Sequence, residues 1–218
     1  QGQAAVLADF GIDEAHLGVP VVSRMDLVSL GTARTAGGTA VEVFWDAEAA
    51  RADHVLVVNR IKAHTAFSGP HESGLMKILS VGLGKAAGAR EIHARGLGEA
   101  MPAAARFVLA NQPILGGVAV VENARHQPVV VEAIPAVQLP QRESELLALS
   151  KTMLPTLPTD RLDVLVVRWM GKDLSGTGMD TNVIGKYRRN WGEPEPNFAR
   201  IEVLDLTDAS HGNAAGVG

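Results

Sequence analysis

The sequence contains no cysteine, no long apolar run and no excess of basic residues. The lack of cysteine excludes disulfide bonds and thiolate metal sites, so any metal must be held by histidine, carboxylate or backbone groups, or by atoms of a bound cofactor. No apolar stretch reaches the roughly 18 residues that a membrane-spanning helix needs. The net charge of −4 argues against a nucleic-acid-binding protein, which usually carries a basic face.

What remains is an ordinary globular composition, with 46% apolar and 20% charged residues in a chain of 218. Helix-like and strand-like segments alternate along it, which indicates an α/β class. Helices are expected at residues 3–11, 46–52, 72–85, 98–111 and 142–154. Strands are expected at residues 18–23, 39–45, 54–59, 116–123, 127–134, 161–170 and 199–206.

The expected strands differ in how they can pair. The segments 116–123 and 127–134 have room only for a hairpin between them, whereas the apolar runs 54–59 and 161–170 are typical of buried parallel strands. We therefore expect mixed, mostly parallel sheets flanked by helices, in two lobes with a site between them. Residues 1–112 form the first expected α/β domain and residues 113–218 the second.

Three of the seven histidines lie between residues 62 and 93. His64 follows the end of the strand-like run 54–59 by five residues, and ligands of α/β sheets bind beyond the carboxyl ends of strands. Arg60 and Lys62 add positive charge that suits a carboxylate or phosphate ligand, and histidine suits acid–base catalysis. The alternative is a solvated basic loop.

Lys77 and His93 stand 16 residues apart in the same stretch. A lysine against an apolar wall can have a depressed pKa and act as a nucleophile. From the residues alone we nevertheless favour a solvent-exposed Lys77, because Met76 and Ile78 do not share its helix face. His93 is a lone histidine, which comes within reach of His64 and Lys77 if the helix between them folds back.

The glycine-rich stretch "GKDLSGTGMDTN" (171–182) exposes backbone N–H groups that can cradle an anion, and Lys172 adds charge. It is not a P-loop, because the lysine leads the motif rather than closing it. Lys186 follows in "GKYRRN". A plain tight loop and a solvated face are the alternatives for these two segments.

Three stretches together resemble the nickel-pincer lactate racemase family, in particular its uncharacterised branch. They are "VNRIKAHTAFSGPHESGLMKILSVGLGKAAGA" followed by His93, "GKDLSGTGMDTNVIG" and "DASHGNAAGVG". The resemblance spans most of the chain. Members of the family are longer, so we expect this chain to be a middle section of a longer protein.

The resemblance implies an isomerase, a racemase or epimerase of a small 2-hydroxy acid. It implies hydride abstraction and return through a covalently held nickel-pincer nucleotide, a pyridinium thioamide/thiocarboxylate mononucleotide carrying nickel. By motif, Lys77 is the covalent anchor, His93 the nickel ligand and His64 the catalytic acid/base. Lys172 and Lys186 are further candidates for cofactor binding. No nucleic-acid or membrane partner is implied, and a cytoplasmic location is expected.

The chain departs from the characterised racemases between His64 and Lys77, where it is longer and carries "PHE" in place of a compact Gly-Gly-Arg. The stretch 171–185 matches only loosely, around Asp180 and Asn182. Two alternatives therefore stay open: a non-catalytic nucleotide- or anion-binding protein of the same fold, and a nickel-free hydroxy-acid lyase acting through His64. His71 has no assigned role.

Overall fold

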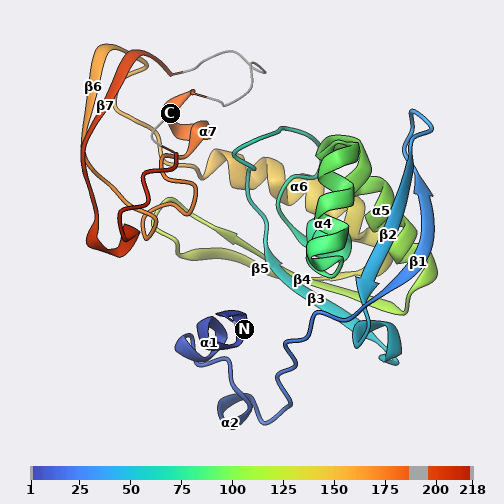
Figure 1. The fold of residues 1–218 in the computed structure, drawn as a ribbon. Helices are drawn as coiled ribbons and strands as arrows, with labels where there is room; N and C mark the ends of the chain where they lie inside the picture. The colour runs from blue at the N-terminus through green and yellow to red at the C-terminus, as the bar shows by residue number, and fades with distance from the viewer. Residues whose placement is uncertain (1, 187–195, 217–218) are drawn as a thin grey trace.

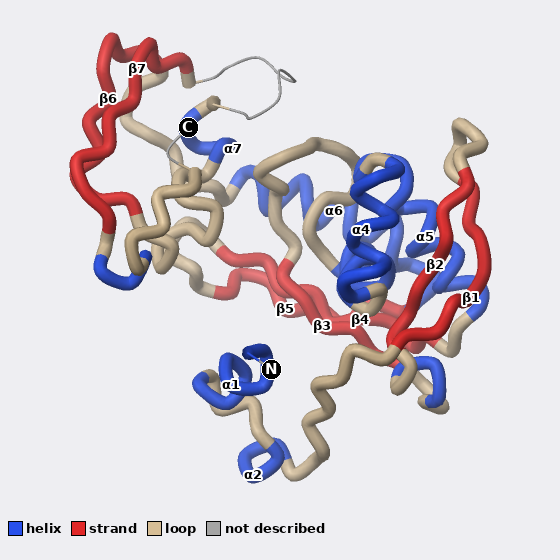
Figure 2. Tube along the Cα trace, in the orientation of Figure 1, coloured by secondary structure: helices blue, strands red, loops and turns tan. Residues whose placement is uncertain are grey.

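The computed structural model describes residues 2–186 and 196–216 and has a mixed α/β architecture (Figure 1). Within these residues the strands form three small sheets, with orders β1-β2, β3-β4-β5 and β6-β7. Figure 2 shows the three longest helices gathered beside the first two sheets and the third sheet set apart from them. No helix of the described part is long and apolar enough to cross a membrane.

The central sheet joins a parallel and an antiparallel pair. Strand β3 (Val55–Arg60) runs parallel to β4 (Ile114–Glu122), which forms a hairpin with β5 (Pro128–Pro135). The predicted hairpin is thus confirmed. Its turn is held by the Asn123 side chain, whose Oδ1 accepts the N–H groups of Arg125 (2.9 Å) and Gln127 (3.1 Å).

Helices cover one face of the central sheet (Figure 1). They are α3 (Leu75–Lys77) and α6 (Leu139–Thr152), while α4 (Lys85–Arg95) and α5 (Leu97–Asn111) pack on β2. On β3, Val57 is buried against the helices, while Leu56 and Val58 point to the opposite face and are exposed. The expectation that this strand is buried on both faces was wrong.

A second hairpin, β1 (Leu27–Arg34) with β2 (Ala40–Asp46), packs on α4 and α5. Trp45 is fully buried there, and its Nε1–H donates to the Leu79 carbonyl (3.1 Å). The strand expected at 18–23 was wrong: this segment is irregular, with exposed Val19 and Val22. The true strand β1 has a weaker apolar pattern and is stabilised by its pairing with β2.

The last part of the chain forms the parallel pair β6 (Arg161–Met170) and β7 (Asn197–Leu206). Between them lies the short helix α7 (Thr181–Ile184). Most of β6 is exposed, which contradicts the buried strand expected at 161–170. In the described part of this region, the buried apolar residues are a small cluster of Met170, Met179 and Ile184, together with Phe198 in β7. The main core contains residues from Ala33 to Leu147.

The expected domain division at residue 112 remains a prediction, although β3 and β4 on either side of it share one sheet. Helix α5 begins at Leu97 and carries Pro102 in its second turn. The predicted N-terminal helix is confirmed as α1. The other described elements are α1 (Gly2–Asp9), α2 (Glu14–Leu17), η1 (Ala49–Arg51), η2 (Ile78–Gly82), η3 (Ala136–Gln138) and η4 (Asp208–Ser210).

Candidate functional site

His64 lies in the connection that leaves the carboxyl end of β3, and its ring is held from two sides. The Ala66 N–H donates to Nδ1 (3.0 Å), and the ring packs against Phe67 with 4.6 Å between centroids. Because Nδ1 accepts a hydrogen bond, the neutral ring carries its proton on Nε2. The half-buried imidazole therefore presents an N–H group at its free edge.

Positively charged groups converge on this histidine. Burial, and then the charge of Lys77, lower the pKa of His64 to about 4, with smaller contributions from His93 and Lys62; Glu72 opposes them. His64 is therefore neutral at pH 7. These electrostatic effects act over short distances, so the fold brings His64, Lys77 and His93 into one neighbourhood.

Lys77 ends the short helix α3 and is half-buried. The exposed lysine that the residues alone favoured is therefore not observed. Burial, and then the charge of Lys62, lower the pKa of the Lys77 amine. A lower pKa increases the neutral fraction of the amine, which is its nucleophilic form.

His93 lies in the last turn of α4, and the chain reaches it through an irregular path. After Lys77 the helix continues as the π-helix η2, a form that is frequent at functional sites. Lys85 then starts α4 with a left-handed φ of 49°. The Nδ1 of His93 lies 2.6 Å from the Ala89 carbonyl oxygen, which can only accept, so Nδ1 donates and the exposed Nε2 is free to bind a metal.

A metal bound here would need donors besides protein side chains. Within residues 2–186 and 196–216, no group of three or more His, Asp or Glu residues is arranged to hold a metal ion. His93 alone offers one nitrogen. The remaining ligands would have to come from a cofactor.

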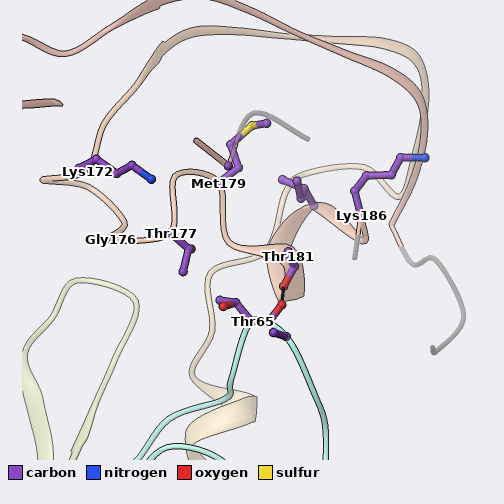
Figure 3. A pocket seen from close by; sticks show the side chains of 10 residues that line it. Thr65, Lys172, Gly176, Thr177, Met179, Thr181 and Lys186 are labelled. Atoms are coloured by element: carbon purple, nitrogen blue, oxygen red, sulfur yellow. Dashed lines mark hydrogen bonds between the residues drawn. The ribbon is translucent and has the colours of Figure 1, made fainter. Parts of the chain in front are cut away.

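A pocket of about 290 Å³ opens beside the His64 loop (Figure 3). Lys172 and Lys186 lie on opposite sides of it, and Thr65 forms part of its wall. The Thr181 hydroxyl donates to the Thr65 carbonyl (2.7 Å), and Lys172 Nζ donates to the Ala215 carbonyl (2.5 Å). The fold thus brings the two lysines predicted from the sequence next to the neighbours of His64.

Asn182 links the glycine-rich segment directly to the histidine. Its Nδ2 donates to the His64 carbonyl (3.3 Å), while Asp180 caps α7 by accepting the Asn182 N–H (2.9 Å). A larger pocket of about 600 Å³ nearby is lined by Arg60, Lys62 and Lys172 among others. Lys62, which also lowers the pKa of Lys77, therefore borders both the cationic cluster and this pocket.

Sequence reasoning missed two buried acids beside the site, Glu72 and Glu143. Glu72 accepts the His64 N–H (2.7 Å), and Glu143 accepts the Met76 N–H (2.8 Å). The unusual "PHE" at 70–72 was the only local signal for Glu72. Glu143 lies in an ordinary amphipathic helix pattern, which contained no signal for its contact with the site.

No family model matches the chain, and no similar curated protein or solved structure was found. The resemblance to nickel-pincer racemases therefore depends on the motifs quoted above and on the geometry of the residues that they contain.

Proposed function

We propose that this protein is a racemase or epimerase of a 2-hydroxy acid that uses a nickel-pincer nucleotide held by Lys77 and His93. The observation that carries the proposal is the shared neighbourhood of Lys77, His93 and His64, three residues that the motif assigns to anchor, metal ligand and acid/base. The expected two lobes with a site between them, the mostly parallel sheets and the cytoplasmic location belong to the same proposal.

The residues present fit this cofactor in three respects. Lys77 has a lowered pKa, as an amine that forms a thioamide requires. His93 offers Nε2 in the metal-binding tautomer, because its Nδ1–H is donated to Ala89. Lys62 is a cation suited to a phosphate. A pincer nucleotide brings most of its own nickel donors, so a single protein ligand suffices.

When bound, the nucleotide supplies an acceptor for a hydride from C2 of the substrate. The chain's own task is to position the substrate and move the hydroxyl proton. Neutral His64 first donates a hydrogen bond from Nε2–H to the substrate. To accept the hydroxyl proton, the ring must use Nδ1 and give up its bond to the Ala66 N–H. Lys172 and Lys186, on the pocket next to Thr65, are the proposed partners of the substrate carboxylate.

A non-catalytic anion-binding protein is the second candidate, because the charges of Lys62 and Lys77 around His64 attract an anion without any metal chemistry. The two candidates differ in whether Lys77 becomes covalently modified.

The test is the intact mass and nickel content of the full-length protein, made in cells that also carry the cofactor-building enzymes. We expect a nucleotide-sized adduct on Lys77 with stoichiometric nickel in the wild type. Lys77→Arg keeps the charge but cannot form the thioamide, so the adduct and the nickel should both be lost. Lys85→Arg is the matched control, because it keeps the ion pair with Asp46.

An unmodified wild-type mass without nickel would contradict the proposal and favour the anion-binding protein. Full racemase activity in Lys77→Arg would contradict it as well, since the anchor would then be dispensable.

A further inference from the structure

Helix α6 contacts the His64 loop through a buried ion pair. The side chain of Glu72 is only 1% exposed, and Lys151 Nζ in the last turn of α6 donates to its Oε1 (2.6 Å). The lysine itself is 39% exposed. A buried carboxylate without a partner is strongly unfavourable, so Lys151 is the counter-ion that allows Glu72 to stay inside the protein.

Glu72 in turn organises the backbone of the loop. Its Oε2 accepts the His64 N–H (2.7 Å), and its Oε1 accepts the Gly69 N–H and the Ser68 hydroxyl (both 3.0 Å). One carboxylate thus closes residues 64–72 into a ring of hydrogen bonds. The position of the His64 backbone, and through it of the imidazole, depends on this carboxylate.

The same helix also holds the segment that carries Lys77. Glu143, buried in α6, accepts the Met76 N–H at the start of α3 (2.8 Å). Its other carboxylate oxygen lies 3.6 Å from Nδ1 of buried His71. Gly74 passes so close that an added Cβ would stand 2.7 Å from the Glu143 carboxyl carbon.

Glu143 and Lys151 are eight residues apart, which is about 12 Å along a helix. One rigid element therefore touches the His64 loop at one point and the Lys77 helix at another. On the side of the site, these contacts involve the "HE" of the "PHE" segment and residues close to it in the sequence. This is the region in which the chain departs from the characterised racemases.

We propose that α6 positions His64 relative to Lys77, with Lys151 acting through Glu72 on the His64 loop and Glu143 acting on the start of α3. These are positioning residues and do not touch the reacting atoms. The catalytic meaning of this arrangement rests on the proposed function, but the positioning is a property of the chain itself.

The test replaces Lys151 by Met, a change at an exposed side chain that leaves the core intact. We expect amide hydrogen exchange at His64 and Gly69 to speed up on the order of tenfold, because the carboxylate that binds them loses its counter-ion. We also expect the NMR-measured pKa of His64 to rise from about 4 towards its ordinary value, since burial is the main cause of its depression. Glu72→Gln should also speed up exchange at both amides, whereas its His64 titration is not a readout, because the charge of Glu72 itself raises the pKa of His64 and is lost in this variant.

The matched control is Arg142→Met, which removes another cation from α6 that pairs with Glu132 and Glu145 instead of the loop. It should leave the exchange at His64 and the histidine titration unchanged, and Lys151→Arg should restore both. Unchanged exchange and titration in Lys151→Met would overturn the proposal. So would a change of equal size in Arg142→Met, which would indicate a general loss of stability.

These readouts need no cofactor, so they separate this inference from the proposed function. A wild-type chain without an adduct on Lys77 would remove the racemase while leaving the positioning by α6 to be decided by exchange and titration.

Discussion

The main core and the β6–β7 pair show how the same kind of sequence leads to different burial. Both β3 and β6 come from continuous apolar runs. In the main core, helices cover one face of the sheet, and residues such as Val57, Leu75 and Leu79 are buried. In the β6–β7 pair, Val166 is 53% exposed and Leu204 is 66% exposed. Burial is thus decided by what packs on a strand, and the stability of the described chain is concentrated in the main core.

Trp45 and Trp169 give the largest expected contrast. Trp45 is fully buried in the main core, so Trp45→Ala should lower the free energy of unfolding by about 3–5 kcal/mol. Trp169 in β6 is half-exposed, with the Arg168 guanidinium 4.2 Å from its ring centroid, so Trp169→Ala should cost only about 1 kcal/mol. Urea unfolding followed by circular dichroism measures both. Equal losses would show that the two regions contribute alike.

A smaller effect is expected where α6 meets the site segment. Gly74→Ala places a Cβ against the Glu143 carboxylate and should destabilise the fold by about 1–3 kcal/mol. The φ of Gly74 is 179°, so the cost comes from the contact and not from backbone strain. Gly98→Ala in α5, where an added Cβ meets nothing within 4 Å, is the control and should be neutral or stabilising. Thermal melts of the two variants compare them, and a Gly74→Ala melt like that of the control would argue against tight packing here.

The smallest expected effect is a pH dependence from the site. The folded-state pKa of His64 is about 4, below the ordinary value of about 6.5. Between these values the unfolded chain binds the extra proton, so His64 contributes stability that is complete above pH 6.5 and is lost as the pH falls towards 4. A single titrating ring limits the slope to at most about 1.4 kcal/mol per pH unit, and its partial solvation reduces the slope further. Urea midpoints across this window should therefore depend less on pH in His64→Gln, and an unaltered slope would contradict the depressed pKa.

Much of the fold could be predicted because its signals are local. The hairpin of β4 and β5, helices α5 and α6 and strand β6 follow from periodicity and turn residues within each segment. Strand β1 could not be predicted, since Ser29, Gly31 and Thr32 interrupt its apolar pattern and its partner β2 supplies the stabilising contacts. The exposed segment 18–23 carries the stronger apolar pattern but has no partner strand.

The candidate site also has a part that could be predicted from the sequence and a part that could not. The spacing of His64, Lys77 and His93 was visible in the motif, whereas the half-burial of Lys77 depends on the assembled fold. The roles of Glu72 and Glu143 could not be predicted, because they depend on contacts between residues 79 and 67 positions apart in the sequence. Long-range packing of this kind leaves no periodic signal in a single sequence.

The irregular turn between Lys77 and His93 has a geometric consequence. In one continuous α-helix, residues 16 positions apart would differ by about 160° around the axis and would face opposite sides. The wide turn Ile78–Gly82 and the left-handed Lys85 break that rotation. The two side chains are therefore not held on opposite sides of one helix axis, and both act on the pKa of His64.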